Sequence, residues 1–156
     1  MTIKTLMIAF AALPLATAAL ADPGHSHGGD RAYGVPGDPK KASRTVAVVM
    51  READGKMEFV PNKIEVRRGE QIKFVLKNDG VLDHELVIGT LAENLKHAIE
   101  MQKNPDMEHD DPNAKRLAPN KAGNIVWRFT KKGAFDFSCL IPGHREAGMS
   151  GSITVK

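Results

Sequence analysis

The sequence predicts an all-β protein built as a β-sandwich, with one short helical insert around residues 91–103. Three observations support this fold class. Short segments of alternating apolar and polar residues recur along most of the chain, turn-forming residues separate them, and only one segment has helical periodicity. About seven or eight short strands with turns between them are typical of two packed sheets.

The expected strands follow one another from residue 45 to the end of the chain. Two of them, 63–68 and 71–77, alternate with period two on either side of a turn at Gly69. The segment 58–61 is short, and Pro61 limits its pairing because proline has no amide hydrogen to donate. The full set of expected strands is 45–50, 58–61, 63–68, 71–77, 84–88, 123–129, 134–138 and 152–155.

One segment has the features of a helix. Thr90 and Glu93 have the spacing of a capping box, in which each side chain bonds the backbone amide of the other. Apolar residues then recur on one helical face, at Leu91, Leu95, Ala98 and Ile99. Pro105 ends the predicted helix. We expect residues 105–121 to form a polar, irregular loop.

The chain is expected to divide into three parts. Residues 1–21 combine one positive charge, an apolar stretch and an A-x-A site, which is typical of a secretory signal peptide cleaved after Ala21. A membrane anchor is the alternative, but the apolar run is short for a span and Pro14 interrupts it. Residues 22–43, rich in Gly, Pro and His, are expected to be a flexible leader, and residues 44–156 one domain. These features predict a periplasmic protein with no membrane span after cleavage.

Charge and cysteine content exclude some classes of protein. The chain has 22 Lys and Arg against 19 Asp and Glu, and its basic residues form no long tract, so no nucleic-acid partner is expected. We expect a monomer. The single cysteine excludes an intrachain disulfide. In an oxidising compartment a lone thiol is a liability unless a metal holds it as thiolate.

That cysteine begins the most informative motif of the chain. Cys139, His144 and Met149 follow the pattern C-x4-H-x4-M, which supplies a thiolate, an imidazole and a thioether from one short loop. His84, at the start of an expected strand, is the candidate for a fourth ligand. Two His and one Cys with a weak axial Met are the ligands of a mononuclear blue-copper site. Gly143 and Gly148 allow tight turns beside two of these ligands.

Two other chemistries remain open for these residues. Zinc also binds Cys and His, although a thioether such as Met149 is a poor zinc ligand. A cysteine nucleophile activated by His144 is conceivable. No orienting Asn or Asp motif and no substrate-binding pattern accompanies it. Copper is therefore the cofactor that the sequence favours.

The motifs together resemble those of the cupredoxin family. The His-rich leader, the stretch from Tyr33 to Lys41 and the Met/His insert resemble the periplasmic copper-tolerance cupredoxins in particular. The family resemblance covers residues 44–156 and rests on Phe59-x-Pro61, Ile64-x-Val66-x-x-Gly69, Phe74 to Asn78, His84 and Cys139-x4-His144-x4-Met149. It implies a Greek-key β-sandwich with one type 1 copper, whose strong ligands are His84, Cys139 and His144 and whose axial ligand is Met149. Many members have Asn or Ser after the first ligand His, whereas this chain has Glu85. A perturbed, greener copper site is therefore expected.

Two further regions contain soft metal ligands. His25 and His27 lie in the expected leader, where weak copper capture and a plain solvated tail are both open. The region after Thr90 contains four more candidates for an auxiliary copper site, namely His97, Met101, Met107 and His109. An exposed helix and loop without metal is the alternative, and the one we favour.

Three functions are compatible with these residues. The first is copper tolerance, through binding copper and cycling it between oxidation states. The second is a mobile electron carrier, which would dock a periplasmic redox protein near His144 through an apolar patch of Leu82, Ile141, Pro142 and Ala147. A copper enzyme is expected least, because catalysis would need further copper centres and the chain has only six His.

Overall fold

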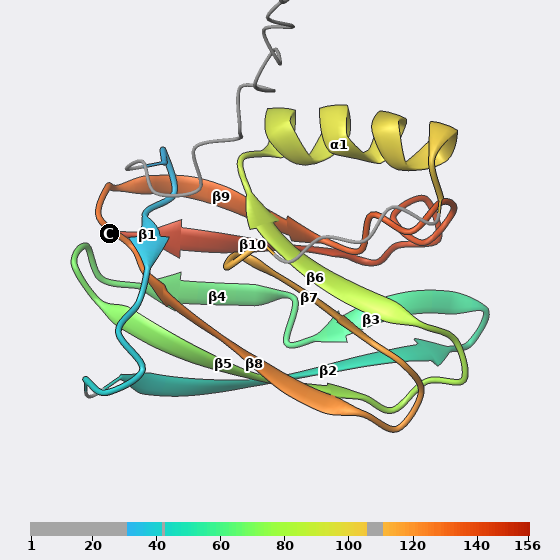
Figure 1. Ribbon diagram of the computed structural model, residues 1–156, viewed down its shortest axis with the longest axis horizontal. Helices are drawn as coiled ribbons and strands as arrows, with labels where there is room; N and C mark the ends of the chain where they lie inside the picture. Colours follow the sequence, from blue (N-terminus) through green and yellow to red (C-terminus); the bar gives the residue numbers. More distant parts are fainter. Residues whose placement is uncertain (1–30, 42, 106–110) are drawn as a thin grey trace, which may run out of the picture.

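The structure is a computed structural model that describes residues 31–41, 43–105 and 111–156. In these residues the chain forms two stacked five-stranded sheets and one helix (Figure 1). The first sheet has the order β1 (Val35–Pro36), β8 (Ala122–Arg128), β5 (Gln71–Asn78), β2 (Arg44–Ala53) and β3 (Lys56–Val60). The second has the order β4 (Lys63–Val66), β10 (Ser150–Val155), β9 (Gly133–Ser138), β6 (His84–Gly89) and β7 (Ala114–Leu117).

Both sheets are mixed. In the first, β2 runs parallel to β5, and in the second, β10 runs parallel to β4. The remaining pairs are antiparallel. All eight expected strands are present, and the predicted sandwich is confirmed.

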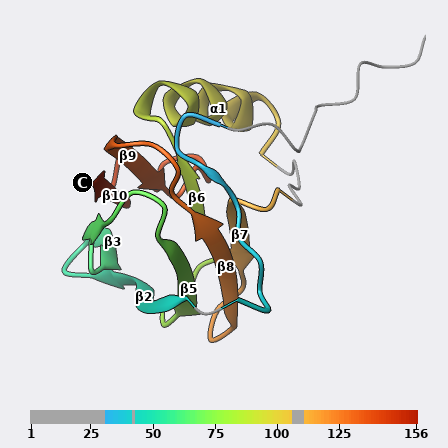
Figure 2. The same ribbon diagram turned by 90° about the vertical axis from the view of Figure 1, so that its left-hand side faces the viewer.

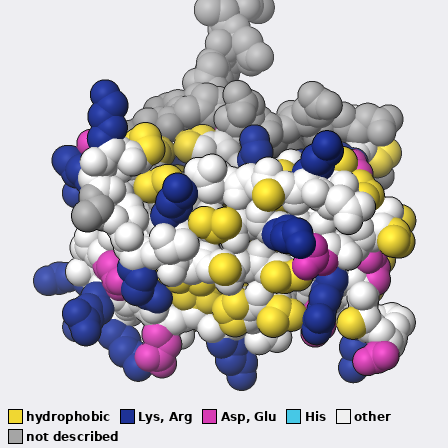
Figure 3. All heavy atoms as spheres, turned by 90° about the horizontal axis from the view of Figure 1, so that it is seen from below, with side chains coloured by type: hydrophobic (Ala, Val, Ile, Leu, Met, Phe, Trp, Pro, Cys, Tyr) yellow, Lys and Arg dark blue, Asp and Glu magenta, His cyan; other side chains and the backbone are white. Residues whose placement is uncertain are grey.

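In strands with one exposed face, every second side chain is buried in the core, as the sequence predicts. In β5, Ile72, Phe74 and Leu76 point into the core, while Lys73 and Lys77 point outward. Basic side chains stand among apolar ones on the outer face of the first sheet (Figure 3). The largest fully buried side chains between the sheets are Trp127, Phe59, Phe74, Phe129 and Phe137.

Strand β6 is buried along its whole length, because the first sheet covers one face and α1 (Leu91–Lys103) covers the other (Figures 1 and 2). The helix begins after Thr90, and both halves of the predicted capping box with Glu93 are present. The predicted helix around residues 91–103 is confirmed.

The predicted apolar face of this helix is wrong as a packing face except at Ala98, which is partly buried against the apolar cluster that contains Met101. Leu91, Leu95 and Ile99 are 52%, 46% and 53% exposed. The helix is instead buried at Asn94 and Met101. The reason is a polar anchor: Asn94 donates from its amide nitrogen to the Val87 carbonyl (3.2 Å) and to Asp136 (2.7 Å), which turns that side of the helix toward the sheet.

Part of the segment that we expected to be a flexible leader is structured. Strand β1 pairs with β8, Tyr33 is buried, and its ring stacks on Trp127 with a centroid distance of 5.5 Å. Within the predicted irregular loop 105–121, residues Ala114–Leu117 form β7 on the edge of the second sheet.

Several expectations fall outside the described residues. These are the signal peptide with cleavage after Ala21, the leader histidines His25 and His27, and the insert residues Met107 and His109. In the part of the chain that the structure describes, no helix has the length and apolar character needed to cross a membrane.

Candidate metal centre

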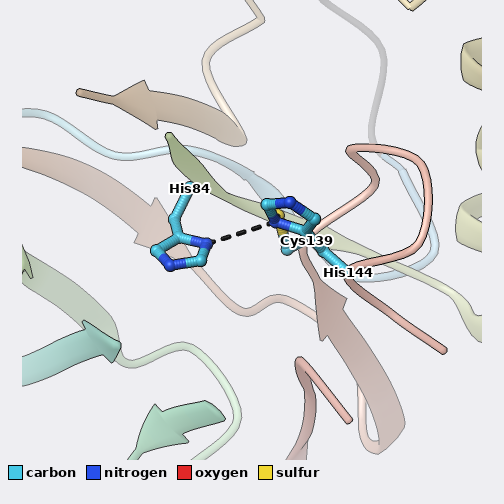
Figure 4. A group of neighbouring side chains, drawn as sticks. All are labelled: His84, Cys139 and His144. Atoms are coloured by element: carbon cyan, nitrogen blue, oxygen red, sulfur yellow. Dashed lines mark hydrogen bonds between the residues drawn. The ribbon is translucent and has the colours of Figure 1, made fainter. Parts of the chain in front are cut away.

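Three of the four predicted ligands meet at one end of the sandwich. His84 begins β6, Cys139 directly follows β9, and His144 lies in the loop that leads to β10. The Nδ1 atoms of His84 and His144 are 3.2 Å apart, and Cys139 Sγ is 3.3 Å from His144 Nδ1 (Figure 4). A donor atom from each of the three residues lies within 4.8 Å of the others. His84 and Cys139 are 55 residues apart in the sequence, and the antiparallel pairing of β6 with β9 brings them together.

The donor set fits a metal ion. His84 and Cys139 are 0% exposed and His144 is 8% exposed. Trigonal donors that each lie about 2.0–2.3 Å from one metal are about 3.5–3.9 Å apart. The observed pairs at 3.2 and 3.3 Å would therefore have to separate by only about half an ångström. Two imidazoles and one thiolate in this arrangement suit copper in both of its common oxidation states.

Met149 is held at the end of the same loop. It is fully buried, and it belongs to the same apolar core cluster as Cys139. Its amide donates to the His144 carbonyl (3.0 Å), and its carbonyl accepts from the Cys139 amide (3.1 Å). Gly143 and Gly148 have φ of 87° and 109°, which only glycine adopts without strain. The two glycine turns bring both ends of the motif together.

Glu85 is tied to the cysteine from the neighbouring strand. Its amide donates to Cys139 Sγ (3.5 Å), and its carboxylate accepts from the Leu140 amide (3.0 Å). The carboxylate is buried, so this bond has little competition from water. The residue expected to perturb the site therefore contacts the thiol through its own amide and holds the backbone of the next residue, Leu140, through its carboxylate.

Glu52 contacts the centre from the opposite sheet, and sequence reasoning missed it. Its Oε1 is 2.9 Å from His84 Nε2, and its two oxygens accept from the amides of Leu82 (3.1 Å) and Val81 (3.0 Å). Partial burial alone would raise the pKa of Glu52, but these amide hydrogen bonds lower it overall. Nothing in the local pattern of β2 distinguishes this residue from other charges at strand ends.

Burial controls the protonation of the donors. It raises the pKa of the Cys139 thiol to about 12. It also lowers the pKa of His144, and the neighbouring His84 lowers it further. At neutral pH the metal-free centre therefore holds a protonated thiol and a neutral His144 imidazole.

A buried polar network adjoins the loop and was also missed. Arg145, next to His144, contacts both oxygens of Asp136 at 3.0 and 3.2 Å. Ser138 and Asn94 donate to the same carboxylate at 2.6 and 2.7 Å. Arg145 also contacts the Ser138 hydroxyl. The network links the ligand loop to β9 and to α1.

Met101, one of the auxiliary candidates, is a core residue. It is 0% exposed and packs in a small apolar cluster with Val87 and Leu140. His97 is only partly buried on the same helix. A weaker auxiliary copper site in the insert stays a prediction, and the burial of Met101 does not support that residue's part in it.

The fold and the buried cluster of two imidazoles and one thiol define a cupredoxin-type β-sandwich. A family model described as copper binding proteins, plastocyanin/azurin family, matches residues 46–156. The chain belongs to this family, and copper is the metal that the family binds. The expected cupredoxin fold and copper cofactor are thereby confirmed.

Curated relatives match nearly the whole chain. The Copper-resistant cuproprotein CopI of Rubrivivax gelatinosus is 49% identical over 164 residues, which cover 99% of this chain and 97% of the relative. The protein of the same name from Pseudomonas aeruginosa is 37% identical and covers 88% of each chain. Among solved structures, reduced auracyanin from Roseiflexus castenholzii superposes with a TM-score of 0.60 at 23% identity, over 74% of this chain and 99% of that one. The last similarity concerns the fold alone.

Proposed function

We propose that this is a periplasmic copper-binding protein that acts in copper tolerance by binding one copper ion and cycling it between two oxidation states. His84, Cys139 and His144 would hold the ion, and Met149 is the proposed fourth, weaker ligand. The observation that carries the proposal is the buried cluster of two imidazole nitrogens and one sulfur, with pair distances of 3.2 and 3.3 Å.

Each residue of the cluster has a defined task in this proposal. His84 and His144 present Nδ1 atoms to a common point, and Cys139 supplies a sulfur that loses its proton when metal binds. Burial of all three donors excludes water from the centre. When bound, copper supplies a one-electron couple. The chain holds the donors in one arrangement, so little has to move between the two states.

Copper tolerance is preferred over other roles because of the relatives. Two proteins named as copper-resistant cuproproteins match 99% and 88% of this chain. Periplasmic location is supported by the apolar segment before Ala21, with its A-x-A site. We propose a binding protein and not an enzyme.

The second candidate function is a mobile electron carrier. It is favoured by the surface beside His144, which is itself 8% exposed. Val81 and Leu82, in the loop that leads to His84, are 81% and 43% exposed, and Pro142, in the loop of His144, is exposed as well. A small apolar surface close to a buried ligand that retains a little exposure suits brief docking of a redox partner.

Growth of a deletion strain in rising copper tests the proposal. We expect wild type to restore growth and Cys139→Ala to fail, with Lys73→Ala on the outer sheet face as a matched control that restores it. Immunoblots of periplasmic fractions check both accumulation and location. Rescue by Cys139→Ala would refute the cluster as the agent of tolerance. Normal tolerance of the deletion strain would favour the electron carrier, which Leu82→Lys should then impair without loss of copper.

A further inference from the structure

The Glu52 carboxylate is fully engaged by groups around His84. Oε1 accepts from the Leu82 amide at 3.1 Å and lies 2.9 Å from His84 Nε2, while Oε2 accepts from the Val81 amide at 3.0 Å. Glu52 belongs to β2 of the first sheet, and His84 to β6 of the second. The carboxylate therefore bridges the two sheets at the metal centre.

The loop before His84 is shaped to receive this carboxylate. A Cβ atom at Gly80 would overlap the Glu52 carboxylate, and the backbone there has no positive φ that would itself require glycine. Asn78 braces the loop: it accepts from the Gly80 amide (2.9 Å) and donates to the Leu82 carbonyl (2.8 Å). The absence of a side chain at Gly80 thus serves to admit Glu52.

The contact determines the tautomer of His84. An ionised carboxylate can only accept, so the proton between the two groups resides on His84 Nε2. In the neutral imidazole, Nδ1 then carries the lone pair, and this lone pair faces His144 Nδ1. A carboxylate that accepts from the distal nitrogen of a ligand histidine also makes the imidazole more basic and therefore a stronger donor.

We propose that Glu52 is a positioning residue that fixes His84 for metal binding and shifts the centre toward Cu(II). A more basic imidazole favours the ion of higher charge, and a nearby negative charge acts in the same direction. The centre would then hold Cu(II) more tightly, relative to Cu(I), than the same donors without the carboxylate. This inference rests on the proposed role of His84 as a ligand.

The experiment compares purified full-length variants. Glu52→Gln removes the charge but keeps an oxygen that can accept from His84 and Leu82. Gly80→Ala keeps the charge and displaces the carboxylate, so it tests the same idea if Glu52→Gln does not fold. Glu58→Gln is the matched control, because Glu58 is a carboxylate of the adjoining strand that pairs with the exposed Arg51 (2.8 Å) and not with His84.

Two readouts separate a tuning role from a merely structural one. The first is the reduction potential together with Cu(I) and Cu(II) affinities from competition with chelators. We expect Glu52→Gln to lower the preference for Cu(II) on the order of tenfold, which for a one-electron couple raises the potential by about 59 mV. The second needs no metal: the proton on His84 Nε2, followed by NMR of the metal-free protein, should move upfield in Glu52→Gln and Gly80→Ala and stay in place in Glu58→Gln.

The outcomes are distinguishable. An unchanged potential and an unchanged Nε2 proton in a folded Glu52→Gln would overturn the inference, and so would a lowered potential. His84→Ala provides the separate test of the proposed site. If it binds copper as tightly as wild type, the proposed ligand set fails, whereas loss of copper in His84→Ala with no effect of Glu52→Gln removes only the inference about Glu52.

Discussion

The titration of the Cys139 thiol gives the sharpest prediction for the metal-free protein. Burial raises its pKa from 9.0 to about 12. Between these values the unfolded chain loses the thiol proton while the folded chain keeps it. The unfolded state then binds fewer protons, so the free energy of unfolding falls as pH rises above 9. The stability is fully present below pH 9, and about 1.4 kcal/mol of it is lost by pH 10.

The assay is favourable because the chain has only one cysteine. Thiolate absorbance in the ultraviolet should show no transition near pH 9 in the folded protein. The difference from Cys139→Ala removes the background of the single tyrosine, Tyr33, whose pKa is raised by burial as well. Urea unfolding at pH 8 and pH 10 should show a larger fall in the free energy of unfolding for wild type than for Cys139→Ala, because both proteins share the contribution of Tyr33. A thiolate transition near pH 9, or equal losses in both proteins, would refute the argument.

The same pKa determines how many protons copper displaces. A thiol with a pKa of about 12 releases close to one proton on metal binding at pH 9, whereas an ordinary thiol would release about half a proton. Calorimetry in buffers of different ionisation enthalpy counts them. A value near one half would place the thiol pKa close to its ordinary value and contradict the burial argument.

Three further predictions concern the surroundings of the centre. Met101→Ala should destabilise the protein by about 2–5 kcal/mol because the side chain is fully buried, whereas Leu95→Ala should cost less than about 0.5 kcal/mol; chemical unfolding measures both. Arg145→Met should cost about 3 kcal/mol, because it leaves a buried carboxylate without its cation, and Arg51→Met at an exposed pair should cost no more than about 1 kcal/mol in the same assay. Glu85→Ala should cost about 1–3 kcal/mol, because the Leu140 amide loses its acceptor, and should shift the copper absorption bands; an unchanged spectrum would separate Glu85 from the thiol.

The sequence predicts those parts of the fold that depend on local periodicity. Alternation along 71–77 is read correctly because the core side of a strand repeats every second residue. Strand β7 is missed because Ala114–Leu117 presents only Leu117 as a fully buried side chain. The helix face is misjudged because the Asn94 amide donates to two buried acceptors on the sheet side, which leaves Leu91, Leu95 and Ile99 exposed.

In the metal centre, too, some residues can be predicted from local sequence and others cannot. Cys139, His144 and Met149 can be recognised because their spacing is local, and His84 because it starts a strand. Glu52 and Asp136 cannot be recognised, because their roles depend on which strands face each other and on where a loop turns. Such contacts exist only once both sheets are packed, and no pattern within β2 or β9 encodes them.

The donors are held by three separate supports, and this arrangement bears on how the protein acquires copper. Glu52 holds His84 from the first sheet, Glu85 holds the backbone beside Cys139, and Arg145 anchors the loop of His144 through Asp136. Each support acts in the absence of metal. Ordering of side chains on binding costs about 0.5–1.5 kcal/mol for each group, so a centre that is ordered beforehand avoids this cost. Such preorganisation increases the affinity for copper. The affinity is reduced by the free energy needed to remove the Cys139 proton, so copper binding becomes stronger as pH rises.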